Sequence, residues 1–284
     1  SPPHSPPPES GNRGWKGLGS TPLGSGLSND DGRATFTSVC REYLLSHALR
    51  SKDIPVVPVT NLFLLPCVSD AVVRDARYES SYQMHVGGVL ERGTGSIWRL
   101  GQALTNSDYN IVCLHAHRHC ECEKRCFFLS TASKLGNLAA KFSASGFVHG
   151  NLNSDNLSVE GLAFDLNVAG FMGQYDPDWV NSEVDADGIY RFSRQAEGIR
   201  WSLVTTAEIL GGVDTAEVER TFDTAFVDEF ERSWEIRLWG NAVKTRDEEE
   251  DRALYPRPHL LYRFLQHLLE NKEDWEVGVW MVLE

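Results

Sequence analysis

The feature that most constrains this sequence is a polar loop enclosed by apolar segments near the middle of the chain. Residues 130–145 repeat apolar side chains at helical spacing, and the loop at residues 149–156 that follows consists largely of His, Asn, Ser and Asp. Short strands are predicted at residues 157–159 and 162–164, and Asp165 follows directly. This order brings amide and carboxylate groups to the ends of short strands. It predicts either a catalytic loop or a surface loop whose Asn and Asp residues form turns.

The protein-kinase fold presents its catalytic loop and its metal-binding Asp in the same order. There, a loop Asn and an Asp after the next hairpin together hold Mg²⁺ on nucleotide phosphates. In this comparison His149 fills the leading His position and Asn156 fills the position of the metal-binding Asn. Asn151 stands where a kinase has its catalytic Asp, and an amide cannot accept the proton of a substrate. Asp155 is the nearby carboxylate that can act as a general base.

A longer run of motifs resembles one family. Residues 149–158, His-Gly-Asn-Leu-Asn-Ser-Asp-Asn-Leu-Ser, are similar to the signature His-Gly-x-Met-Asn-Thr-Asp-Asn-Met-Ser of the selenoprotein O (SelO, YdiU) family. The resemblance covers residues 14–205 and implies a kinase-like fold that transfers AMP, rather than phosphate, from ATP to protein hydroxyl groups. Further blocks that match in the same order lie at residues 15–22, 31–34, 41–44, 170–172, 175–177 and 188–203.

The resemblance implies four residues that bind ATP phosphates. Lys16 matches the phosphate-binding Lys, and Glu42 matches the helix Glu that pairs with it. Arg92 and Arg99 match two family arginines with the same spacing of seven residues. In the family these arginines hold the phosphates of an ATP that is bound in reverse orientation. The α-phosphate then lies next to the acceptor hydroxyl, and pyrophosphate is the leaving group.

The resemblance also implies the metal ligands and the base. Asn156 and Asp165 match the residues that bind Mg²⁺, and Asp155 matches the proposed general base. Hard oxygen ligands of this kind are what Mg²⁺ requires. The segment at residues 165–171, Asp-Leu-Asn-Val-Ala-Gly-Phe, departs from the family sequence Asp-Tyr-Gly-Pro-Phe-Gly-Phe. We therefore expect a changed loop after the Asp and an altered Mg²⁺ geometry.

Three functions follow from these patterns. The first is protein AMPylation, with ATP and Mg²⁺ as cofactors and with proteins bearing Ser, Thr or Tyr hydroxyls as partners. The second is a catalytically inactive, pseudokinase-like remnant that binds nucleotide, which the changed loop after Asp165 favours. The third is an ordinary phosphotransferase on the same fold, against which Asn151 argues because it replaces the base Asp.

The predicted fold is α+β, a protein-kinase-like two-lobed fold with an incomplete N-lobe and a truncated helical C-lobe. We expect a disordered Pro/Ser-rich lead at residues 1–12, a partial N-lobe-like region at 13–98 and a helical C-lobe-like region at 99–284, with the catalytic loop at 147–171. Because the chain starts without Met and lacks the ends that family members have, we expect a partial or divergent member. Helices are also predicted at residues 35–47, 199–210, 218–234 and 260–269, and strands at 54–65, 71–74, 83–91 and 147–148.

The charge and composition of the sequence limit the partners and cellular compartments that we expect. Lys and Arg number 27 against 40 Asp and Glu, a net charge of −13, which argues against a general nucleic-acid binder. No apolar run approaches the ~18 residues of a membrane-spanning helix, so we expect no membrane span. The start of the chain lacks the basic and apolar regions of a signal peptide, so we do not expect secretion. The resemblance implies a mitochondrial protein in a eukaryote and a cytoplasmic protein in a bacterium.

A cluster of Cys and His at residues 113–126 is a separate feature. It contains four Cys and three His, the soft ligands that zinc prefers. The cluster lacks two well-separated ligand pairs, and the family does not have it. We interpret it as a variable insertion, with a metal-binding interaction module as the alternative.

Overall fold

The chain divides into two compact units. Unit 1 takes the described residues up to Trp98 and the segment Leu162–Val168, and unit 2 takes those of Arg99–Gly161 and those from Ala169 onward. Helices combined with small antiparallel sheets confirm the predicted α+β class, whereas the kinase-like lobes stay a prediction. The computed structural model describes residues 13–19, 32–65, 71–74, 82–93, 98–102, 123–182 and 185–239. The predictions for residues 1–12, 113–122 and 260–269 lie outside the described residues.

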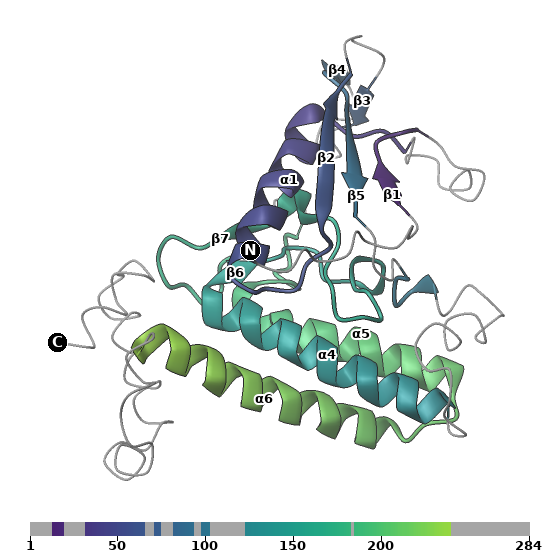
Figure 1. Cartoon of the computed structure of the whole chain (residues 1–284), viewed down its shortest axis with the longest axis vertical. Helices are drawn as coiled ribbons and strands as arrows, with labels where there is room; N and C mark the ends of the chain where they lie inside the picture. The colour runs from purple at the N-terminus through teal and green to yellow at the C-terminus, as the bar shows by residue number, and fades with distance from the viewer. Residues whose placement is uncertain are drawn as a thin grey trace, which may run out of the picture. The chain divides into compact units, whose positions relative to one another are not determined.

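Unit 1 is built on a three-stranded antiparallel sheet in the order β1-β5-β2 (Figure 1). The strands span Gly14–Lys16 (β1), Val59–Leu64 (β2) and Gly88–Arg92 (β5). All residues of β5 are buried, as expected for a central strand. A separate antiparallel hairpin pairs β3 (Ala71–Arg74), at the predicted position, with β4 (Tyr82–His85).

The single strand predicted at residues 83–91 is wrong, because β4 and β5 are separate strands. At the break, the chain lies against the start of helix α1. The carbonyl of Val86 accepts a hydrogen bond from the backbone N–H of Phe36 at 2.7 Å. A Cβ atom on Gly88 would lie only 2.4 Å from Cγ2 of Val39. This close approach to α1 requires glycine at the first residue of β5.

Helix α1 (Phe36–Ser51) packs on β2 and β5 (Figure 1). Its first turn is capped by Thr35, whose side chain accepts a hydrogen bond from the backbone N–H of Ser38 at 3.2 Å. Val39 forms a buried cluster with Val59 of β2 and Leu90 of β5. Phe36 and Tyr43 of the predicted stripe also pack against this cluster, whereas Leu44 of the same stripe is 67% exposed. Of the strands predicted within residues 54–65, the structure contains β2, which starts directly after Pro58.

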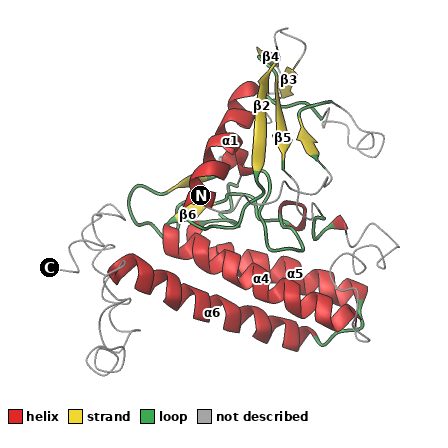
Figure 2. Ribbon diagram, in the orientation of Figure 1, coloured by secondary structure: helices red, strands yellow, loops and turns green. Residues whose placement is uncertain are grey.

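The described part of unit 2 is built on the helices α4 (Glu123–Ser145), α5 (Gln195–Leu210) and α6 (Thr215–Trp239). Helix α4 lies beside both α5 and α6 (Figure 2). A Cβ atom on Gly136 would lie 2.5 Å from the carbonyl oxygen of Phe222, so this glycine allows α4 and α6 to approach closely. Helix α4 begins at Glu123 rather than at residue 130. The large buried side chains of this unit include Phe127, Phe128, Leu135, Leu138, Phe142 and Phe222.

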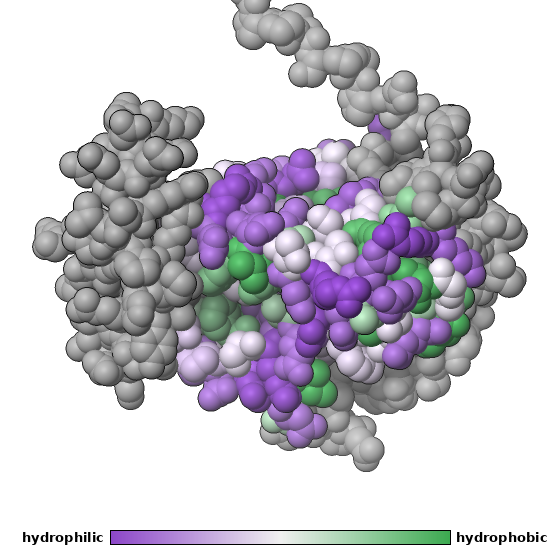
Figure 3. All heavy atoms as spheres, turned by 90° about the horizontal axis from the view of Figure 1, so that it is seen from below, coloured by the Kyte–Doolittle hydropathy of each residue, from purple (hydrophilic) through white to green (hydrophobic). Residues whose placement is uncertain are grey.

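The outer faces of the helices are mainly polar. Figure 3 shows hydrophilic residues with smaller apolar areas between them on the described part of one face. Such a mixture is normal for the surface of a folded domain. No helix among the described residues combines the length and the apolar character that crossing a membrane requires.

The polar loop lies between β6 (Phe147–Val148) and β7 (Gly170–Phe171), which pair antiparallel. The strands predicted at residues 157–159 and 162–164 are wrong, because each segment forms only an isolated bridge. Ser158 pairs with Arg99 in unit 2, and Ala163 pairs with Val56 in unit 1. Gly161, at a φ of 74°, turns the chain between them against the backbone of α4, so the two segments do not pair with each other.

Candidate active site

The first group of predicted site residues lies in unit 1, where ion pairs join their side chains to one another. Lys16 donates from Nζ to Glu42 Oε2 at 2.8 Å and to Asp165 Oδ1 at 2.7 Å. Arg92 donates to Glu42 Oε1 from Nε at 2.9 Å and from Nη2 at 2.6 Å. Its Nη2 also lies 2.6 Å from Asp165 Oδ1. Two cations and two carboxylates from four separate parts of the chain therefore form one network, which we call the charge network.

The packing of α1 on the sheet explains why these side chains meet. Lys16 pairs with Leu90, two residues before Arg92 on the neighbouring strand. Because alternate residues of a strand share a face, Lys16 and Arg92 point to the same side of the sheet. Glu42 lies on the buried face of α1, one turn after Val39, which packs against Leu90. Apolar packing therefore fixes the carboxylate of Glu42 beside both cations.

Asp165 enters the charge network from a strained backbone position. Its φ is 56°, in the left-handed region, which costs roughly 1–2 kcal/mol for a residue with a side chain. The next three residues form the short helix η2 (Leu166–Val168), which packs against α1. The ion pairs with Lys16 and Arg92 offset this strain. The segment that departs from the family sequence after the Asp therefore begins as a helical turn.

Arg92 remains positively charged inside the protein. It is only 5% exposed, and burial alone would lower its pKa. The charges of Glu42 and Asp165, and the hydrogen bonds to them, outweigh burial and raise the pKa of Arg92 above its usual value. The guanidinium carbon also lies 5.7 Å from the ring centroid of Phe164, a cation–π distance. A buried charge of this kind is tolerated because it is fully paired.

The second group of predicted site residues lies on the polar loop in unit 2. Asp155 is exposed, and its backbone N–H donates to Oδ1 of Asn153 at 3.0 Å. Asn156 is 5% exposed, and its Nδ2 donates to the carbonyl of Asn151 at 2.8 Å. That bond orients the amide of Asn156 and leaves its oxygen as the atom that can bind a cation. The loop is therefore fixed by its own Asn side chains, in the short helix η1 (Ser154–Asn156).

Gln195, at the start of α5, supports this loop, although the sequence analysis gave it no role. Its Oε1 accepts from the backbone N–H of His149 at 2.9 Å, and its Nε2 donates to the carbonyl of Phe147 at 2.8 Å. Gln195 and His149 are both fully buried. The only signal in the sequence was a single polar residue inside a motif block, which gave no indication of its partner.

The structure separates the two predicted phosphate-binding arginines into different units. Arg92 belongs to unit 1 and Arg99 to unit 2. Arg99 donates from Nη1 to the backbone carbonyl of Asp155 at 2.6 Å. Its backbone N–H donates to Oε1 of Gln102 at 2.9 Å. Arg99 thus contacts the loop that carries the predicted base, and its phosphate-binding role stays a prediction.

The structure therefore brings together Lys16, Glu42, Arg92 and Asp165 in unit 1. In unit 2, Asp155 and Asn156 share one short helix that Arg99 contacts. Within the described ranges, no set of three or more His, Cys, Asp or Glu side chains is placed to hold a metal ion. The oxygens of Asn156 and Asp165 are nevertheless of the chemical type that suits Mg²⁺.

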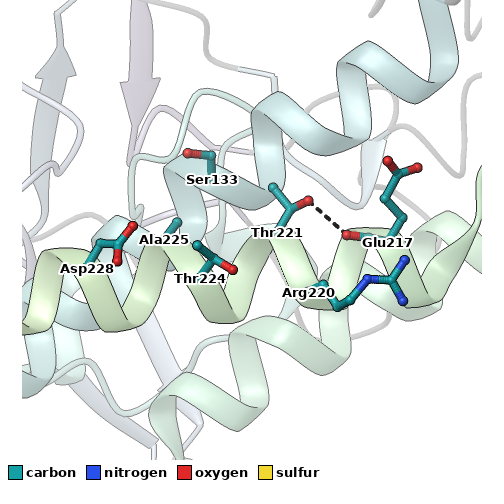
Figure 4. Close-up of a pocket in the computed structure, with 7 residues that line it drawn as sticks. All are labelled: Ser133, Glu217, Arg220, Thr221, Thr224, Ala225 and Asp228. Atoms are coloured by element: carbon teal, nitrogen blue, oxygen red, sulfur yellow. Dashed lines mark hydrogen bonds between the residues drawn. The ribbon is translucent and has the colours of Figure 1, made fainter.

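A pocket of about 420 Å³ lies elsewhere in unit 2, between α4 and α6 (Figure 4). Ser133 of α4 and polar residues of α6 from Glu217 to Asp228 form its wall. Thr221 donates from its hydroxyl to the carbonyl of Glu217 at 2.8 Å. No predicted site residue lines this pocket, so it is not the candidate active site.

Comparisons with known proteins point to one class. The sequence profile of the family described as "Protein adenylyltransferase SelO" matches residues 9–278. A relative from Rhodopirellula baltica is 28% identical over 256 residues, which cover 83% of this chain and 46% of the relative. A relative from Xanthomonas axonopodis pv. citri is 32% identical, covering 73% and 42%. A relative from Nitrobacter hamburgensis is 33% identical, covering 69% and 39%.

All three relatives are named "Protein nucleotidyltransferase YdiU", which places the similarity in the class of protein nucleotidyltransferases. The chain belongs to the SelO family, as the motifs predicted. It spans less than half of the length of these curated relatives. The predicted compartments, mitochondrial or cytoplasmic, stay predictions.

Proposed function

We propose that the protein transfers AMP from ATP to the hydroxyl groups of Ser, Thr or Tyr side chains in other proteins. The observation that carries the proposal is the charge network of Lys16, Glu42, Arg92 and Asp165. Membership of a family described as a protein adenylyltransferase supports it. Because the chain spans less than half of its curated relatives, the activity of this chain is itself part of the proposal.

Lys16 and Arg92 are the proposed phosphate ligands of unit 1. Both cations contact Glu42 and Asp165, and Glu42 binds each of them through a different oxygen. Glu42 can therefore keep both cations aligned while Asp165 binds another ligand. A pair of cations fixed before ATP arrives costs little reorganisation when the phosphates bind. Arg99 is the third proposed phosphate ligand, on the basis of its match to the family.

Asn156 and Asp165 are the proposed Mg²⁺ ligands. They offer an amide and a carboxylate oxygen, which are hard ligands, and Mg²⁺ commonly uses only one or two protein carboxylates. Bound Mg²⁺ would neutralise phosphate charge and help to align ATP.

Asp155 is the proposed general base. Its carboxylate is exposed, whereas its backbone is held by Asn153 and Arg99. The carboxylate accepts the proton of the substrate hydroxyl while the hydroxyl oxygen forms a bond to the α-phosphorus. The bond between that phosphorus and the bridging oxygen breaks, and pyrophosphate leaves with the electron pair. Positive charge from Lys16 and the arginines stabilises the leaving group.

A second candidate function is nucleotide binding without transfer. One observation favours it: Oδ1 of Asp165 accepts hydrogen bonds from both Lys16 and Arg92. A carboxylate that stays bound to two cations is a poor metal ligand. An ordinary phosphotransferase is less well supported, because Asn151 stands where such an enzyme needs its base.

Transfer of label from ATP separates these functions. The protein is incubated with Mg²⁺ and with ATP labelled at either the α or the γ phosphate, using the chain itself and a mixture of lysate proteins as acceptors. We expect covalent label from α-labelled ATP only, and its loss in Asp165→Asn. Label from γ-labelled ATP alone would refute the proposal. No label, together with a rise in melting temperature on adding ATP, would support the second candidate.

The matched control is Asp178→Asn. Asp178 is 75% exposed and pairs at 3.1 Å with Arg191, which is not a predicted site residue. The same change of carboxylate to amide there should leave the transfer of label unchanged. An equal loss in both variants would point to a general effect of charge rather than to the role of Asp165.

A further inference from the structure

A short segment of unit 2, residues 99–101, holds the loop that carries Asp155. The backbone N–H of Leu100 donates to the carbonyl of Leu157 at 2.7 Å, and that of Gly101 donates to the carbonyl of Ser154 at 3.0 Å. Arg99 also bridges to Ser158 and donates to the carbonyl of Asp155. Leu100 is fully buried and anchors the segment. The contacts fix the backbone on both sides of the proposed base.

Gly101 contacts the carboxylate of Asp155 directly. A Cβ atom built on Gly101 would lie 2.4 Å from Oδ1 of Asp155 and 3.0 Å from Oγ of Ser154. Gly101 does not adopt a positive φ, so its backbone conformation is open to any residue. The reason for glycine here is therefore space, and the space is occupied by an oxygen of Asp155.

The hydrogen bonds of Asp155 within the described part of the chain involve its backbone. Its backbone N–H and carbonyl are both hydrogen-bonded, which leaves rotation of an exposed side chain as its main freedom. Gly101 forms one wall of the space in which that side chain rotates. Any larger residue at position 101 would displace the carboxylate, because its Cβ would lie 2.4 Å from Oδ1.

We propose that Gly101 is a positioning residue that sets the place of the Asp155 carboxylate. The inference rests on the proposed function, in which this carboxylate is the general base. A base must lie within hydrogen-bond reach of the proton that it accepts. A displacement of about 1 Å at a reacting group can lower the rate by about 100-fold. A single methyl group at position 101 is enough to impose such a displacement.

The first test compares Gly101→Ala with Gly173→Ala in the AMP-transfer assay. Gly173 is the matched control, since its added Cβ would meet nothing within 4 Å and its φ is not positive. We expect kcat of Gly101→Ala to fall by roughly 100-fold while KM for ATP is unchanged. Unchanged kcat would overturn the proposal. An equal change in kcat and KM, or the same loss in Gly173→Ala, would also overturn it, because it would indicate a general structural effect.

The second test uses thermal unfolding and does not depend on activity. The melting temperature is measured for the unmodified protein, for Gly101→Ala, for Asp155→Ala and for the double variant. We expect Gly101→Ala to lower the melting temperature when it is the only change. The decrease should be smaller when Asp155 is already Ala, because the crowded oxygen is then gone. Equal shifts in both backgrounds would refute the contact. If the unmodified protein transfers no AMP, the proposed function fails, and non-additive shifts would still uphold the placement of Asp155 by Gly101.

Discussion

The two groups of predicted site residues are held in place by different kinds of structure. In unit 1, the charge network joins β1, α1, β5 and the residue before η2, which are far apart in the sequence. In unit 2, the loop around Asp155 is held mainly by its own Asn side chains and by residues 99–101. The first group depends on the packing of a helix on a sheet. The second depends on hydrogen bonds to the backbone of a short loop.

This difference predicts different responses to mutation. Removing one carboxylate from the charge network leaves a buried cation without its partner, which is costly because the interior cannot solvate it. Removing one support of the loop leaves one or two neutral polar groups unsatisfied, which costs less. The charge network should therefore control the stability of unit 1, whereas the loop contacts should mainly control the position of Asp155.

The largest effect on the free energy of unfolding is expected from Glu42→Gln. Glu42 is 2% exposed and accepts hydrogen bonds from both Lys16 and Arg92. The neutral amide cannot balance the two cations, so we expect a loss of about 3 kcal/mol in the free energy of unfolding. Urea unfolding measures it. The matched control is Glu231→Gln on the exposed side of α6, which should change stability by less than about 0.5 kcal/mol. Equal losses of unfolding free energy in the two variants would show that the charge network stabilises the protein no more than an exposed carboxylate does.

A smaller effect is expected from Gln195→Ala. Gln195 is fully buried and bonds the backbone N–H of His149 and the carbonyl of Phe147. Alanine leaves both groups without these bonds, and each unsatisfied group costs about 1–3 kcal/mol, which water entering the space partly offsets. We expect a loss of about 2 kcal/mol by urea unfolding, against almost none for Gln174→Ala at an exposed position. A loss larger than that of Glu42→Gln would reverse the comparison between the two units.

Local patterns predicted the elements that local sequence determines. The helical spacing of residues from Phe36 to His47 gave α1, and the apolar periodicity of residues 130–145 gave most of α4. The predicted strands at residues 157–159 and 162–164 failed, because β structure depends on partners that are distant in the sequence. The break between β4 and β5 was missed for the same reason, since the chain at Val86 is bonded to the start of α1.

The resemblance named the site residues and one of the pairings between them. The pairing of Lys16 with Glu42 was expected, and the structure contains it. The bonds from Arg92 to Glu42 and Asp165 were not expected, because they depend on β5 lying beside β1 in the sheet. The contact between Gly101 and Asp155 likewise needs three-dimensional coordinates. A glycine in a sequence gives no sign of which atom fills the space beside it.

The smallest effect on stability is expected from a change at Glu91, which precedes Arg92 and lies on the other face of β5. Glu91 accepts from Arg13 Nη1 at 2.8 Å and from the side chain of Asn61. The hydrogen bond from Asn61, followed by the charge of Arg13, outweighs burial and holds the pKa of Glu91 below its usual value of 4.5. The resulting stability is therefore present above pH 4.5 and is lost as the pH falls through the lowered pKa.

Glu91→Gln removes this titration. We expect the melting temperature of the variant to fall less steeply than that of the unmodified protein as the pH falls below 4.5. The difference should be smaller than the effects of Glu42→Gln and Gln195→Ala, because Arg13 is 70% exposed and water screens its charge. Melting curves across this range, with Glu231→Gln as the control, measure it. Parallel curves for Glu91→Gln and the unmodified protein would show that only the Arg92 face of β5 carries charge-dependent stability.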